Sequence, residues 1–189
     1  MPDNSFVKLA RFILLVSCCL CLLGPLRLFA DDAVLQQALK SMNVTAPKAF
    51  LPAPSFSLSD IEQQTVRLSD YRGKLVLLNF WASFCAPCRR EMPALESLWL
   101  RYRDQGLVVL ALSADRDNLQ RVSAFINEGR YSFPVLLDTE GEVRKTYEVR
   151  ALPTSYLIGR DGRFVGRIIG EREWDSVRGR KMIELLLSR

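Results

Sequence analysis

Hydrophobic residues form two nearly unbroken runs in the middle of the chain, at Leu75 to Trp81 and at Leu107 to Leu112. Runs of this kind are typical of β-strands that are covered on both faces of a sheet. Between them, from Pro87 to Tyr102, apolar residues recur at helical spacing while charged residues take the other face. The order strand, helix, strand predicts a crossover unit.

Shorter patterns predict the elements around this unit. Phe56-Ser57-Leu58 and Thr65-Val66-Arg67-Leu68 alternate as the two strands of a β-hairpin do, with a polar turn between them. Gly159-Arg160-Asp161-Gly162 is typical of a second hairpin turn. We further expect helices at 119–126 and 173–187 and strands at 134–138, 155–158 and 163–169.

The first thirty residues have the pattern of an export signal. Lys8 and Arg11 precede the uncharged run 12–26, and an acidic pair follows a cleavage position after Ala30. The run is shorter than the roughly 20 residues of a membrane-spanning helix. Leu28 is large for a cleavage site, and Leu15-Val16-Ser17-Cys18 resembles a lipoprotein box. A cleaved signal, an anchor touching the membrane through residues 12–28, and a lipoprotein therefore stay open, and each predicts export to the periplasm or the outer face of the cytoplasmic membrane.

The rest of the chain is long enough for one globular domain. Residues 31–54 contain a predicted short helix at 33–42 and then Pro47, Pro52 and Pro54, which are typical of a linker. The domain itself is predicted to span residues 55–189, a usual length for a single core.

Charge and composition exclude several classes of function. Removing residues 1–30 from the totals of 26 basic and 21 acidic residues leaves 23 and 20, interspersed rather than clustered. A nucleic-acid partner is therefore not expected, because it would favour a basic stripe. The chain has no histidine, which excludes Ser-His and Cys-His catalysis and removes the commonest transition-metal ligand.

Two of the five cysteines, Cys85 and Cys88, lie in the predicted domain, directly after the first buried run. Three interpretations compete for this pair. A zinc site needs four ligands, which the domain does not offer, and a structural disulfide that closes so short a loop stabilises little. A redox dithiol fits best, because a strand that ends in a turn and opens a helix favours a thiolate at the helix N-terminus. Cys85 is then the exposed nucleophile and Cys88 the resolving thiol, and neither a metal nor another cofactor is expected.

The residues around the pair resemble an active site of the thioredoxin family. Phe80-Trp81-Ala82-Ser83-Phe84-Cys85-Ala86-Pro87-Cys88 carries the resemblance, although the chain is not thioredoxin itself. Leu68-Ser69-Asp70-Tyr71-Arg72-Gly73-Lys74, Arg89-Arg90-Glu91-Met92-Pro93 and Leu152-Pro153-Thr154 resemble the exported TlpA/ResA/DsbE-like branch. The resemblance implies an α/β thioredoxin-like fold with a central mixed β-sheet flanked by helices and an N-terminal β-hairpin extension.

The same resemblance implies roles for residues beyond the two cysteines. It implies a cis bond between Leu152 and Pro153, facing the dithiol and pairing with an extended substrate. Thioredoxin carries a buried Asp where this chain has Asn79, and Glu91, three residues beyond Cys88, is expected to accept the proton of Cys88 instead. The alternative for Glu91 is a simple dipole effect at the helix start. Trp81 and Pro87 are also candidates for the site, Trp81 as a substrate contact or a core residue, and Pro87 as a restraint on the loop.

The pattern as a whole predicts an exported protein disulfide reductase. Strong oxidants of this fold resemble one another in a His between the cysteines, and this chain has Ala86-Pro87 there. The resemblance implies a membrane thiol-electron donor of the DsbD/CcdA type, and cysteines of apocytochrome c or of a copper-site protein as substrates. Two other classes stay open: a module that escorts a metal or a thiol partner without turnover, and a thiol peroxidase.

Overall fold

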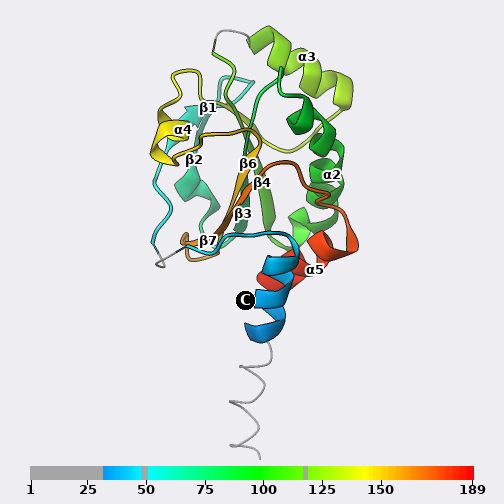
Figure 1. Ribbon diagram of the computed structural model, residues 1–189. Coiled ribbons are helices and arrows are strands. Elements are labelled where there is room, and N and C mark those ends of the chain that lie inside the picture. The colour runs from blue at the N-terminus through cyan, green and yellow to red at the C-terminus, as the bar shows by residue number, and fades with distance from the viewer. Residues whose placement is uncertain (1–31, 48–50, 117–118) are drawn as a thin grey trace, which may run out of the picture. The chain divides into compact units, whose positions relative to one another are not determined.

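A computed structural model describes residues 32–47, 51–116 and 119–189. A five-stranded sheet forms the centre of the domain (Figure 1). The predicted export signal at residues 1–30 lies outside the described residues. The chain divides into two compact units, Met1–Gln37 and Ala38–Arg189. The described residues include a helix at 32–41, close to the predicted range.

The sheet is mixed, and its strands lie in the order β5-β4-β3-β6-β7. Strand β3 runs parallel to β4, and β4 parallel to β5, whereas β6 is antiparallel to both β3 and β7. The bounds are β3 Leu75–Trp81, β4 Leu107–Ser113, β5 Val135–Leu137, β6 Thr154–Ile158 and β7 Phe164–Ile169. A separate antiparallel hairpin consists of β1 Ser57–Ser59 and β2 Thr65–Arg67. Because β3 is central, all seven of its residues are buried, as the unbroken apolar run predicts.

Helices cover both faces of the sheet. Figure 1 shows α2 and α5 on one side and α4 with the hairpin on the other. The helix bounds are α2 Ala86–Tyr102, α3 Leu119–Gly129, α4 Glu142–Thr146 and α5 Val177–Leu187, and short 3-10 turns occupy Leu68–Tyr71 and Arg103–Gln105. Alternate side chains of β3 point to opposite faces, so Val76, Leu78 and Phe80 pack on the α4 side and Asn79 points the other way.

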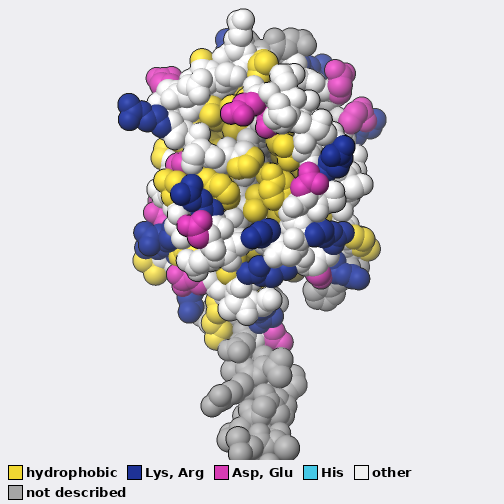
Figure 2. Space-filling view, turned by 180° about the vertical axis from the view of Figure 1, so that it is seen from behind, with side chains coloured by type: hydrophobic (Ala, Val, Ile, Leu, Met, Phe, Trp, Pro, Cys, Tyr) yellow, Lys and Arg dark blue, Asp and Glu magenta, His cyan; other side chains and the backbone are white. Residues whose placement is uncertain are grey.

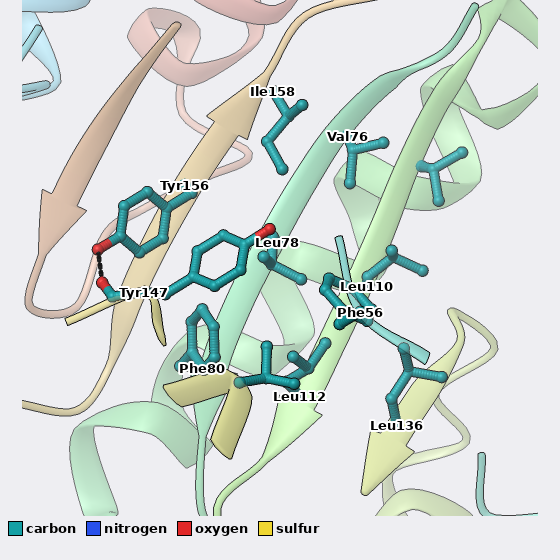
Figure 3. Close-up of a cluster of buried hydrophobic side chains, with 12 residues drawn as sticks. Phe56, Val76, Leu78, Phe80, Leu110, Leu112, Leu136, Tyr147, Tyr156 and Ile158 are labelled. Carbon is teal, nitrogen blue, oxygen red and sulfur yellow. Dashed lines mark hydrogen bonds between the residues drawn. The ribbon is translucent and has the colours of Figure 1, made fainter. Parts of the chain in front are cut away.

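The core on the α4 side is rich in aromatic rings (Figure 3). The rings of Tyr147 and Phe80 lie 5.5 Å apart, and Tyr147 also meets Tyr156 and Phe164 edge to face. Both buried hydroxyls have partners, since Tyr147 donates to the Pro54 carbonyl and Tyr156 to the Tyr147 carbonyl. These bonds avoid the cost of a buried unpaired hydroxyl and fix the segment after α4 to the sheet.

The predicted elements are confirmed in type at almost every position, with two helix boundaries wrong and one helix missed. The helix predicted to end at residue 126 continues in α3 to Gly129. The pattern places the start of the last helix at Glu173, but α5 begins at Val177, where the Ser176 hydroxyl accepts a hydrogen bond from the Gly179 amide at 3.2 Å and caps the helix. Helix α4 was not predicted, because five residues are too few for a clear period.

Charged side chains of both signs surround an apolar centre on the face shown in Figure 2. Among the described residues on this face, the lysines and arginines form no continuous stripe. The interspersed charges of the sequence are thus also mixed in space on this face.

Candidate active site

The two cysteines lie where β3 gives way to α2. Cys85 is the N-cap of α2, and its sulfur accepts a hydrogen bond from the Cys88 amide at 3.3 Å. The two form a disulfide with a Cα–Cα distance of 5.3 Å. Cys85 is partly exposed and Cys88 has no exposed surface. The unpaired amides and the dipole of a helix N-terminus favour negative charge on the sulfur of Cys85 when the disulfide is reduced.

The backbone of the loop before Cys85 is held by a buried carboxylate. Asp115, just beyond the end of β4, accepts hydrogen bonds from the Ser83 amide at 2.9 Å and the Ser83 hydroxyl at 2.6 Å. The Ser113 hydroxyl donates to the same carboxylate at 2.8 Å. Parallel strands β3 and β4 end at one edge of the sheet, and this explains why a residue after β4 reaches the loop after β3.

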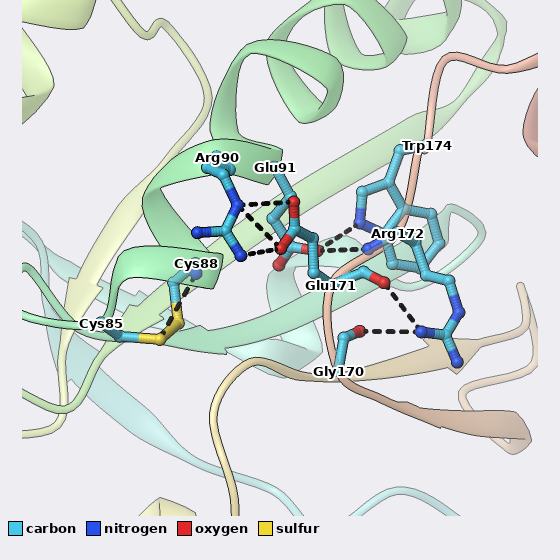
Figure 4. A network of polar contacts seen from close by, with 8 residues as sticks. All are labelled: Cys85, Cys88, Arg90, Glu91, Gly170, Glu171, Arg172 and Trp174. Carbon is cyan, nitrogen blue, oxygen red and sulfur yellow. Dashed lines mark hydrogen bonds and ion pairs between the residues drawn. A yellow bond between two sulfur atoms is a disulfide. The ribbon is translucent and has the colours of Figure 1, made fainter.

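A second buried carboxylate, Glu91, lies one helical turn beyond Cys88 on α2 (Figure 4). Only 2% of Glu91 is exposed. Asn79 Nδ2 donates to its Oε1 at 2.8 Å, and the Arg172 amide and Trp174 Nε1 donate to its Oε2, each at 3.1 Å. The donors come from β3 and from the segment Gly170–Trp174 between β7 and α5.

Burial raises the pKa of Glu91 to about 7 from an ordinary 4.5, because an ionised carboxylate loses its hydration there. The three hydrogen bonds act in the opposite direction, and the nearby charge of Glu171 raises the pKa further. Glu91 therefore holds or releases a proton near neutral pH, as a group that exchanges protons with a thiol must.

Asn79 can serve both protonation states of Glu91. Its Nδ2 also donates to Ser155 Oγ at 2.9 Å, and its Oδ1 is buried without a partner in the described part of the chain. A half-turn of the amide would exchange donor and acceptor, so that Oδ1 would accept a hydrogen bond from the hydroxyl of a neutral Glu91. An Asp at this position would instead place a second carboxylate against Glu91.

The bond between Leu152 and Pro153 is cis, as the sequence resemblance implies. It directly precedes β6, whose first residue, Thr154, pairs with Phe80 near the end of β3. The antiparallel register therefore brings this loop to the edge of the sheet from which the Cys85 loop leaves. The Gly170 amide donates to the Pro153 carbonyl at 2.8 Å and ties the same loop to the segment that reaches Glu91.

Comparison with known proteins places this arrangement in a family. The family model described as the AhpC/TSA family matches residues 51–166. The chain belongs to the AhpC/TSA family. Its similarity to a curated relative, the thiol-disulfide oxidoreductase ResA of Bacillus thuringiensis subsp. konkukian, is 42% identity over 120 residues, which cover 64% of this chain and 69% of the relative. The ResA of Oceanobacillus iheyensis is 39% identical over 131 residues, 67% of this chain and 68% of the relative.

Solved structures agree with this assignment. A candidate thiol:disulfide interchange protein DsbE from Chlorobium tepidum aligns with a TM-score of 0.69 and 31% identity, over 76% of this chain and 99% of that one. A thiol-disulfide oxidoreductase from Bacteroides fragilis aligns with a TM-score of 0.58 and 30% identity, over 63% of this chain and 90% of that one. This AhpC/TSA-family chain therefore has the thioredoxin-like fold and is a thiol-disulfide oxidoreductase of the ResA and DsbE type.

The structure of this family member brings the predicted site residues to one end of the sheet, and it places Trp81 in the core, one of the two environments predicted for it. Trp81 is fully buried and its ring lies 5.4 Å from that of Phe125, so a predicted contact with substrate has no exposed surface to use here. Phe84, which directly precedes Cys85, is 68% exposed, so its aromatic side chain lies on the surface where that of Trp81 does not. Pro87 is half-buried in the first turn of α2, where a missing N–H costs no hydrogen bond.

Sequence reasoning missed Asp115 and Trp174. Asp115 had a readable signal, since an acidic residue directly after a fully buried strand lies at the edge where such sheets carry their sites. Trp174 had none, because the pattern placed it inside the last helix. Within the described residues, no three His, Cys, Asp or Glu side chains group as a metal site would require, and no helix has the length and apolarity to cross a membrane.

Proposed function

We propose that this oxidoreductase is an exported reductase of specific protein disulfides, with Cys85 as nucleophile and Cys88 as resolving thiol. The observation that carries the proposal is the asymmetry of the pair. Cys85 is partly exposed at the start of α2, and its sulfur accepts a hydrogen bond from the Cys88 amide, whereas Cys88 itself is shielded from solvent. A partner's disulfide can therefore reach one sulfur first, which gives the two steps a defined order.

In the first step, the thiolate of Cys85 attacks one sulfur of the substrate disulfide. The substrate S–S bond breaks, a mixed disulfide forms, and the departing substrate thiolate takes up a proton. In the second step Cys88 loses its proton, attacks the sulfur of Cys85 and releases the second substrate thiol. Two electrons pass to the substrate, and the enzyme is left with the Cys85–Cys88 disulfide that the structure contains.

Glu91 is the proposed acceptor for the proton of Cys88. It follows Cys88 by three residues on α2, a spacing that places two side chains on one helix face. Burial has already brought its pKa to about 7, close to that of a thiol that must ionise at neutral pH. Asn79, which has no acidic group, supports Glu91 through its amide.

Pro87, Leu152 and Pro153 are the proposed site for the substrate chain, around the exposed edge of Cys85. Pro87 and Leu152 are partly exposed, and Pro153, which is buried, contributes backbone rather than side-chain surface. The cis peptide bond lies at the edge from which the Cys85 loop leaves the sheet, where a backbone can pair with an extended peptide. Because a reductase outside the cytoplasm needs electrons from within, a membrane thiol carrier of the DsbD/CcdA type is the proposed donor. Cysteines of apocytochrome c or of a copper-site protein are the proposed substrates.

A trapping experiment tests the order of the two thiols. Cys85→Ser should abolish reduction of a disulfide-bonded peptide by the chemically reduced protein, since the remaining thiol of the pair, Cys88, has no exposed surface with which to attack the peptide. Cys88→Ala should instead accumulate a mixed disulfide through Cys85, visible by mass spectrometry and cleaved by dithiothreitol. The paired variants serve as controls for each other. If Cys88 proves to carry the trapped peptide, or if Cys85→Ser keeps full activity, the proposal is wrong.

A further inference from the structure

The segment Gly170–Trp174 connects the Pro153 loop to the buried carboxylate of Glu91, and Figure 4 draws its contacts with Glu91. At its start, the Gly170 amide donates to the Pro153 carbonyl, and at its end Trp174 Nε1 donates to Glu91. Between them, the Arg172 amide donates to the same Oε2 atom as Trp174. One short stretch of chain, outside every motif that carries the family resemblance, thus supplies two of the three donors of Glu91.

Several contacts fix the position of Trp174. Its side chain has no exposed surface. On one side, Arg90 of α2 forms a bidentate ion pair with Glu171, with Nη2 and Oε2 2.5 Å apart. On the other side, α5 packs so closely that a Cβ on Gly179 would lie 2.1 Å from the Trp174 carbonyl oxygen. The backbone around Trp174 is thus tied to α2 through Glu171 and packed against α5 through its own carbonyl, and the buried indole donates to Glu91 from this position.

We propose that Trp174 is a positioning residue for Glu91, and that its indole N–H keeps the carboxylate oriented and able to ionise beside Cys88. An N–H donor stabilises the ionised form of a buried carboxylate much more than the neutral form. Two other groups donate to Glu91: Asn79 of β3, with Ser155 of β6 behind it, and the Arg172 amide. The charge of Glu171, which is paired with Arg90, also acts on Glu91, and Cys88 precedes it by one turn of α2. This inference rests on the proposed role of Glu91 as proton acceptor.

The unmodified protein allows a first test, because it has only three tryptophans. In a protein with 15N-labelled indoles, the Nε1–H signal of Trp174 should move with pH, with a midpoint at the pKa of Glu91. The signal of Trp99 is the internal control, since its Nε1 is buried and has no hydrogen-bond partner among the described residues. Glu91→Gln should abolish the movement. A Trp174 signal that stays constant through this range would overturn the proposal.

A matched pair of variants gives the functional test. Trp174→Phe keeps an aromatic ring and removes the N–H, and Trp99→Phe makes the same change at an indole that donates to no group in the part of the chain that the structure describes. Losing one hydrogen bond to a charged group corresponds to about one pKa unit. The pH midpoint for disulfide reduction should therefore rise by about one unit in Trp174→Phe and stay unchanged in Trp99→Phe.

The outcomes separate this inference from the function on which it rests. If Glu91→Gln leaves the pH profile of reduction unchanged, the proposed role of Glu91 fails, whatever the indole signal does. If Glu91→Gln removes the midpoint but Trp174→Phe behaves like Trp99→Phe, the role of Trp174 fails and that of Glu91 stands. If Trp174→Phe does not fold, the indole titration of the unmodified protein decides.

Discussion

Two carboxylates are buried beside the same disulfide, Glu91 with 2% of its surface exposed and Asp115 with 5%. Each accepts three hydrogen bonds. Those of Asp115 come from Ser83 and Ser113, at the two strand ends that it joins, and two of the donors are hydroxyls that can turn. Those of Glu91 are all N–H groups, contributed by β3 and by the connection to α5.

The difference shows that burial of a charge does not by itself indicate its role. Asp115 bonds the backbone amide of Ser83, so its carboxylate shapes the loop that carries Cys85. Glu91 accepts hydrogen bonds from two side chains and one backbone amide. It shares a helix face with Cys88, and its pKa is raised to about 7. We therefore expect loss of Asp115 to lower the stability of the fold, and loss of Glu91 to change how stability depends on pH.

The largest expected effect is that of Asp115→Ala. The change leaves the Ser83 amide and two buried hydroxyls without their acceptor, and we expect the free energy of unfolding to fall by about 4 kcal/mol. Denaturant unfolding of the oxidised protein measures it, with Asp104→Ala, whose side chain is 90% exposed, as control. A loss well under 1 kcal/mol would show that the Asp115 network does not hold the loop.

The second prediction concerns Glu91→Gln and the pH dependence of stability. A carboxyl whose folded pKa is raised from 4.5 to about 7 contributes most below pH 4.5, and its contribution is lost as pH rises to 7. The wild-type protein should therefore lose up to about 3 kcal/mol across this interval relative to Glu91→Gln. Unfolding of both proteins at pH about 4.5 and about 8 measures the difference, and parallel curves would contradict it.

The smallest effect is expected for Ser83→Ala, which removes one hydroxyl donor to Asp115 and keeps the hydrogen bond from the backbone amide of residue 83. We expect a loss of about 1 kcal/mol, the usual value for a single hydrogen bond, and a slower reduction rate without a shift of its pH midpoint. Comparison with Ser113→Ala, which removes the other hydroxyl, shows whether the two serines contribute equally. A shifted midpoint would mean that Asp115 also takes part in proton exchange.

The strands and the dithiol could be predicted because their signals are local. An unbroken apolar run identifies a buried strand, and two cysteines spaced by two residues at the start of an amphipathic helix indicate redox chemistry, whatever the rest of the chain does. The structure confirms strands β3 and β4 with nearly the predicted bounds, and the comparisons confirm the family. The cis bond before β6 was predicted from family resemblance, because no local pattern distinguishes it.

The region from Glu173 to Ser176 shows where local reasoning fails. Its residues continue the helical pattern of α5, yet Ser176 caps the helix and Trp174 turns inward to Glu91, 83 residues away in the sequence. The helix therefore begins only after Trp174, whose indole donates to a buried carboxylate that no local window of sequence reveals.

The sequence by itself determined the order of the elements, the position of the thiol pair and the family of this protein, because periodicity and motif spacing depend on near neighbours. Only the tertiary structure decided which carboxylate shapes the loop, which has a raised pKa and which residues donate to each of them. Those properties depend on burial and on donors from distant segments, and both exist only once the chain is folded.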